Sequence, residues 1–225
     1  MKSRITLAFI LCIALLAVPL CSCSQNRSYD EAEVLSEAER LIEESALWNE
    51  IFYGEGIPYE KNESLSNGYY YPADQAYLEN AGFDTVEELE RLLRKTYTAE
   101  LSDIIVATKL EAVSDNTGVQ GYARYYQKYS SLDKDKSPEC IMVYSRADVL
   151  LDSEVEYDYS TLSVKESKGQ TVFVELSATV TNKEGKSQKR VIVVGLIEEE
   201  AGWRIDTPTY LRYLDSDYYE EIQNK

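Results

Sequence analysis

The chain has 225 residues, with 40 acidic and 23 basic side chains, a formal net charge of −17 and no histidine. The acidic excess excludes nucleic acid as a partner, because affinity for phosphates comes from Lys and Arg. The lack of histidine excludes Ser-His-Asp and Cys-His catalysis, and zinc sites built on histidine. We therefore expect a protein that is not an enzyme and that holds no metal or other cofactor.

The N-terminus has the pattern of a secretory signal peptide. Residues 1–4 are basic, and residues 5–20 form an uncharged apolar run. A membrane-spanning helix needs about 20 residues, and Pro19 interrupts the run, so we rank a signal above a transmembrane anchor. The next residues, Leu20-Cys21-Ser22-Cys23, resemble the lipobox of bacterial lipoproteins, with Cys23 at the position of the lipidated cysteine.

This resemblance implies that residues 1–22 are a lipoprotein signal peptide and that the lipid on Cys23 holds the protein on the extracytoplasmic face of the cell membrane. Removing the signal leaves 21 basic and 40 acidic side chains, a net charge of −19. Anionic headgroups repel such a protein, so the lipid itself must supply the anchor. The alternative is an ordinary signal peptide, which would leave Cys23 free to pair with Cys140. Residues 23–28 are predicted to be a polar tether.

Three amphipathic helices are predicted in the first half of the chain. The first begins at a cap on Ser28, repeats apolar residues every three or four positions, and ends at Gly54. Asp84, followed three residues later by a glutamate, has the spacing of a capping box for the second helix. Thr98 supplies the cap of the third.

The C-terminal half is predicted to be an antiparallel meander. Strands over residues 171–181, 191–197 and 203–207 are separated by short polar turns that contain glycine. Residues 152–159 alternate acidic and larger side chains, which is typical of an edge strand protected by charge. The apolar positions that share one face of the first strand are Val172, Val174, Leu176, Ala178 and Val180.

Helices followed by strands predict one α+β domain over residues 29–214, with N-terminal helices packed on a curved antiparallel sheet and an acidic tail at 215–225. This order resembles the NTF2-like (cystatin-like) superfamily, in which a sheet wraps around helices as a cone. Residues 47–58, with the tyrosines at 69–71, resemble a segment of secreted bacterial inhibitors of cell-wall DL-endopeptidases. That resemblance implies a role and transfers no functional residue.

Tyrosine is the compositional excess, with 19 copies. Its apolar face and polar tip suit interfaces and clefts, although strand propensity on a half-exposed sheet explains part of the excess. The candidate binding surface consists of Trp48, Phe52, Tyr122, Tyr125, Tyr126 and Tyr129.

These patterns predict a lipid-anchored extracytoplasmic binding protein that modulates or inhibits a cell-wall hydrolase. Its expected partner is a cationic envelope protein or a cell-wall component, because an acidic surface steers a cationic one. The first alternative is a small-molecule binding protein that uses an NTF2-like pocket. An enzyme with a buried carboxylate base ranks last.

Overall fold

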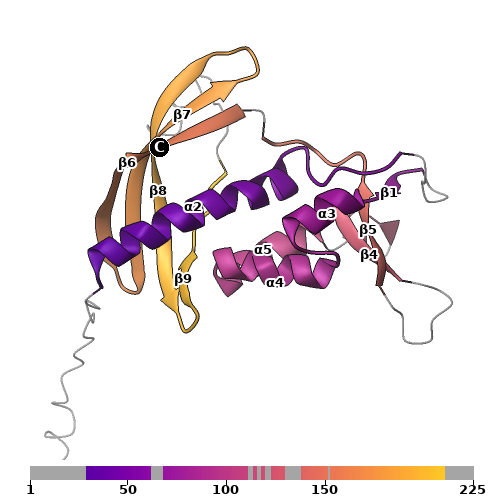
Figure 1. Cartoon of the computed structure of the whole chain (residues 1–225), viewed down its shortest axis with the longest axis horizontal. Coiled ribbons are helices and arrows are strands. Elements are labelled where there is room, and N and C mark those ends of the chain that lie inside the picture. Colours follow the sequence, from indigo (N-terminus) through magenta and orange to yellow (C-terminus); the bar gives the residue numbers. More distant parts are fainter. Residues whose placement is uncertain are drawn as a thin grey trace, which may run out of the picture.

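The structure is a computed structural model that describes residues 29–61, 68–110, 114–115, 118–119, 123–129, 138–151 and 153–210. The predictions for the signal peptide, the tether, Cys23, Ser28, Tyr122 and the tail at 215–225 lie outside these residues. The described part is α+β, with helices and antiparallel sheets, as predicted (Figure 1).

The described residues include a long helix and three shorter ones, which are α2 (Glu31–Tyr53), α3 (Gln75–Ala81), α4 (Val86–Thr96) and α5 (Ala99–Lys109). The first helix is capped by Asp30, whose carboxylate accepts hydrogen bonds from the amides of Ala32 and Glu33. The cap therefore lies two residues beyond the predicted one. The end at Gly54 and the cap at Thr98 are confirmed.

Within the described residues, the strands form three sheets in which all neighbouring strands are antiparallel. The three-stranded sheet has the order β1–β5–β4, from Tyr70–Pro72, Pro138–Tyr144 and Tyr125–Tyr129. A short pair joins β2 (Ser114–Asp115) to β3 (Gly118–Val119). The four-stranded sheet has the order β6–β7–β8–β9, from Ser153–Lys168, Thr171–Asn182, Ser187–Glu199 and Gly202–Ile205.

The alternation of β7 gives the four-stranded sheet one buried face. The predicted apolar positions Val172 to Val180 are 0–3% exposed, and Trp203 and Ile205 of β9 join the same core. Strand β6 lies at the edge of this sheet, as predicted, but it continues to Lys168 with shifts in register against β7.

Helix α2 connects the two larger sheets. Figure 1 shows it crossing the four-stranded sheet and extending towards the three-stranded one. The hydroxyl of Tyr125 in β4 donates to the carbonyl of Ile51, near the C-terminal end of α2, at 2.5 Å. Helices α4 and α5 join the four-stranded sheet where the amide of Thr98 donates to the carbonyl of Ile205 at 2.9 Å. The C-terminal end of α2 is therefore where this helix meets the three-stranded sheet.

Candidate functional site

The predicted aromatic surface is not assembled as one surface. Phe52 and Tyr125 are fully buried, and Trp48 is 5% exposed. Their polar atoms have internal partners, since the indole of Trp48 donates to Thr96 and the hydroxyl of Tyr125 accepts from the amide of Ile57. These three residues belong to the core, because tyrosine and tryptophan are well suited to buried sites in which the polar tip finds a partner.

Two other members of the predicted set remain accessible. Tyr126 is half-buried, with its ring 4.8 Å from that of Tyr70, and Tyr129 at the end of β4 is 50% exposed. They lie on a different part of the molecule from Trp48.

Side chains fill the space between α2 and the four-stranded sheet. Val34, Ala38 and Leu41 of the helix have no exposed surface, and Val174 and Leu176 of the sheet are at most 1% exposed. All five belong to one buried apolar cluster. A small-molecule site in a hollow cone is therefore not supported here, and such a site has to be sought elsewhere.

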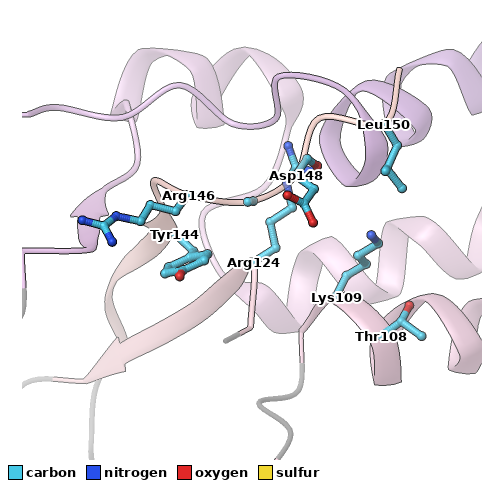
Figure 2. A pocket seen from close by; sticks show the side chains of 8 residues that line it. Thr108, Lys109, Arg124, Tyr144, Arg146, Asp148 and Leu150 are labelled. Atoms are coloured by element: carbon cyan, nitrogen blue, oxygen red, sulfur yellow. Dashed lines mark hydrogen bonds between the residues drawn. The ribbon is translucent and has the colours of Figure 1, made fainter. Parts of the chain in front are cut away.

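A pocket of about 390 Å³ lies beside the C-terminal ends of α2 and α5 (Figure 2). It is formed by the last turn of α5, the residue that precedes β4, the end of β5 and the segment that follows β5. Its lining residues are Thr108, Lys109, Arg124, Tyr144, Arg146, Ala147, Asp148 and Leu150. Three cations and one carboxylate therefore line a pocket in a strongly acidic protein.

Arg124 forms the buried part of this pocket, at 5% exposure. Its guanidinium donates to the carbonyls of Phe52 at 3.0 Å, Gly54 at 2.5 Å and Asp148 at 3.4 Å, and to the hydroxyl of Tyr125 at 3.0 Å. Helix α2 has no basic side chain in its last turn, so Arg124 satisfies the carbonyls and the negative dipole at that end. Among the described residues, no carboxylate lies within ion-pair distance of Arg124.

The backbone beside Arg124 is shaped to admit it. Gly56 has a φ of +86°, which favours glycine. A Cβ atom there would lie 2.5 Å from Nη2 of Arg124 and 2.6 Å from the hydroxyl oxygen of Tyr125. The glycine at the exit of α2 therefore leaves room for the guanidinium.

Lys109 is the second cation of the pocket and lies in the last turn of α5. Its ammonium is 4.8 Å from the ring centroid of Tyr53, which stacks on Tyr210 at 4.3 Å. Burial lowers the pKa of Lys109, the charge of Arg124 lowers it further, and Asp148 raises it. No described carboxylate forms an ion pair with Lys109, so its charge is available to a ligand.

The last two charged residues stand at the rim. The guanidinium of Arg146 lies 4.1 Å from the ring centroid of Tyr69 and extends away from Arg124 (Figure 2). Asp148 is exposed, and no hydrogen bond or ion pair of its carboxylate is formed within the described part of the chain. Arg146 therefore adds positive charge at the entrance, while Asp148 brings a single acceptor group beside Lys109.

A scan against models of known protein families and a search of curated proteins both find no match for this chain. Within the described residues, no group of three or more His, Cys, Asp or Glu side chains is placed to hold a metal ion. In the same residues, no helix combines the length and the apolar character needed to cross a membrane.

The sequence patterns did not predict this pocket. Lys109 ends a helix, Arg124 follows Ala123 at the start of a tyrosine-rich strand, and Arg146 lies in a turn, so the three share no motif. The usable signal was Arg124, an arginine next to residues expected to be buried in a strand. Because Arg is seldom fully buried without partners, such a position indicates a polar site inside the fold. In chemical terms, cations held by neutral groups can bind a carboxylate or a phosphate through charge-assisted hydrogen bonds.

Proposed function

We propose that this chain is a binding protein rather than an enzyme, and that its basic pocket takes an anionic group of its ligand or partner. The observation that carries the proposal is that Lys109 and Arg124 line the same pocket and that, among the described residues, neither forms an ion pair with a carboxylate. Partial removal of water from a cation is unfavourable unless the charge is compensated. The carbonyl groups compensate Arg124, and an incoming anion would compensate Lys109.

We further propose that the protein is held on the extracytoplasmic face of the membrane by a lipid on Cys23 and that it modulates a cell-wall hydrolase. The support is the lipobox resemblance, the segment at residues 47–58 and the acidic surface. Glu154 and Glu156 are exposed on β6. Burial of the Tyr159 hydroxyl is the main cause that raises the pKa of Tyr159 to about 12, and the nearby carboxylates of Glu43 and Glu39 in α2 add to it. This acidic side would steer a cationic partner.

The NTF2-like form of the fold also remains a proposal. Its support is the order of helices before strands and the position of α2 across a four-stranded meander. The division of the strands among separate sheets departs from the single curved sheet of the expectation.

The second candidate function is that of a small-molecule binding protein, and the basic pocket is the observation that favours it. Its volume of about 390 Å³ lies within the range of roughly 300–1,000 Å³ that is common for ligand sites. A carboxylate-dependent enzyme stays last, with Asp148 as the carboxylate that would have to act in this pocket.

A capture experiment tests the first function. Residues 24–225 are immobilised and exposed to an extract of the cell envelope, beside a K109Q/R146Q variant and a K183Q/K189Q control. The control removes the same charge from two exposed lysines outside the basic pocket. We expect the native chain and the control to retain a cationic protein in a salt-sensitive way. The pocket variant should retain less of it than the control does, because it lacks the cations that bind the anionic group of the partner. Equal capture by all three forms, or no capture by any, would refute the role of the pocket.

The proposed anchor has a separate test. Mass spectrometry of the mature N-terminus should show a chain that begins at a diacylated Cys23. A chain with an unmodified Cys23, or with Cys23 joined to Cys140, would contradict it.

A further inference from the structure

Two opposite charges extend into the same part of the basic pocket without pairing. Lys109, Arg124 and Asp148 line the same pocket, and Figure 2 shows the ammonium of Lys109 extending from α5 towards the side where the side chains of Asp148 and Arg124 lie. No ion pair within 4 Å joins them among the described residues, although the carboxylate acts on the lysine through space. A gap is therefore left between a donor group and an acceptor group.

The two charges come from separate elements. Lys109 belongs to α5, and Asp148 to the segment after β5, whose backbone carbonyl accepts from Arg124 at 3.4 Å. The same segment is held to α2 by the amides of Leu150 and Leu151, which donate to the carbonyl of Tyr53 at 2.7 and 2.8 Å. Backbone contacts thus position Asp148 opposite Lys109, so that the spacing of the two charges does not depend on a direct contact between them.

A simple anion fits this arrangement poorly. It would gain the attraction of Lys109 and of the positive floor at Arg124, but it would also meet the exposed carboxylate of Asp148 at close range. A ligand that carries an ammonium next to its carboxylate compensates both. The ligand carboxylate would then accept from Lys109 and the ligand ammonium would donate to Asp148, so that neither side chain faces a charge of its own sign.

On this basis we infer that the basic pocket recognises a zwitterionic α-amino acid group, with the ligand carboxylate towards Lys109 and Arg124 and the ligand ammonium towards Asp148. The inference rests on the proposed function, since it specifies the kind of ligand whose carboxylate the same pocket takes. The volume of about 390 Å³ leaves room for more than the α-carbon and its two charged groups. Leu150 and Tyr144 supply lining for the remainder of the ligand.

Binding to blocked analogues tests the inference. Calorimetric titration of residues 24–225 compares glycine, alanine, leucine and lysine, in both enantiomers where they exist, and takes the tightest binder forward. We expect its N-acetyl and its amide derivatives each to bind about tenfold more weakly or worse, because each loses one charge-assisted hydrogen bond. Absence of binding by every amino acid at millimolar concentration, or equal binding of the N-acetyl derivative, would overturn the inference.

Two variants assign the charges. D148N should weaken the free amino acid about tenfold and leave its N-acetyl derivative unchanged or tighter, whereas K109Q should weaken both. Because the carboxylate of Asp148 makes no hydrogen bond or ion pair within the described residues, D148N should keep the native melting temperature. If D148N has no effect on the amino acid, the inference fails while an anion site at Lys109 still stands; if K109Q also has no effect, the proposed pocket fails as well.

The source of the amino acid group is decided by one more ligand. A γ-glutamyl peptide carries the same zwitterionic group at the end of a longer molecule. Tighter binding of this peptide than of free glutamate supports recognition of an end group, and weaker binding supports a free amino acid. A peptide blocked at that end should bind no better than the N-acetyl amino acid.

Discussion

The four-stranded sheet and the basic pocket are both in contact with α2 and are built on opposite principles. At the sheet, apolar side chains of α2 and β7 exclude water, and the acidic side chains Glu154 and Glu156 of β6 are exposed. At the C-terminal end of α2, a buried arginine and main-chain carbonyls form the contact instead. Packing supplies stability in the first region, whereas in the second region polar groups held in place leave charge available for binding.

The largest effect is expected from a cavity in the apolar region. Leu176 of β7 is 1% exposed, so Leu176→Ala should lower the free energy of unfolding by about 2–5 kcal/mol. Val191 of β8 is 66% exposed, so Val191→Ala serves as the matched control, with a change of about 0.5 kcal/mol or less. Urea unfolding of both variants measures the difference. Equal losses would show that the sheet is not packed on one face only.

The polar region should respond to the geometry of its cation rather than to its charge. Arg124→Lys keeps the charge but loses the fork that reaches Phe52 and Gly54, so we expect a loss of about 2–3 kcal/mol. Arg40→Lys, on the exposed face of α2 where the arginine pairs with Glu37 and Glu44, should cost about 0.5 kcal/mol or less. The comparison uses the same urea unfolding. A neutral Arg124→Lys would mean that charge alone holds the junction.

A smaller loss is expected where the backbone makes room for that cation. Gly56→Ala should cost about 1–3 kcal/mol, since it adds strain at a positive φ and places a methyl group against Arg124. Gly185→Ala, at a φ of +78° with no atom within 4 Å of the new methyl group, isolates the strain alone. In thermal unfolding, Gly56→Ala should therefore have a lower melting temperature than Gly185→Ala. The reverse order would contradict close packing at the exit of α2.

The smallest effect is a change in titration without a change in fold. Burial and Arg124 lower the pKa of Lys109 from its ordinary value of 10.5, so this lysine loses its charge at a lower pH than exposed lysines do. The affinity of the pocket for the N-acetyl derivative, which has no titrating amine of its own, should accordingly fall as pH rises through the lowered pKa of Lys109, and K109Q should not show the fall. Because Asp148 raises the pKa of Lys109, D148N should lower it further. NMR titration of labelled lysines measures both shifts, and a Lys109 that titrates with the exposed lysines would contradict the burial.

The apolar region was predictable because its order is local. Alternation in β7 and the turn at Gly185 determine the buried face and the hairpin, and both are confirmed. Cap positions were less accurate, because neighbouring residues offer similar side chains. Helix α4 uses Thr85 where Asp84 was predicted, and Glu88 returns a bond to the amide of Asp84.

The pocket was not predictable from patterns of that kind. Arg124, just before β4, bonds to Gly54 at the end of α2, 70 positions earlier in the sequence. Lys109 and Asp148 are brought together by separate elements. For a related reason, Trp48, Phe52 and Tyr125 are buried where an exposed aromatic surface was predicted. Period and propensity place Tyr125 on a strand, but the partner that buries its hydroxyl, the carbonyl of Ile51, is fixed only by the tertiary fold.

The length of α2 has a consequence for where a ligand would be met. Cys23 lies seven positions before the cap at Asp30, and fully extended this stretch spans at most about 25 Å. The 23 residues of the helix add a further ~35 Å before the carbonyls that Arg124 holds. In the lipid-anchored form that we propose, the helix is thus a spacer that can present the pocket up to about 60 Å from the bilayer surface, well clear of the lipid headgroups.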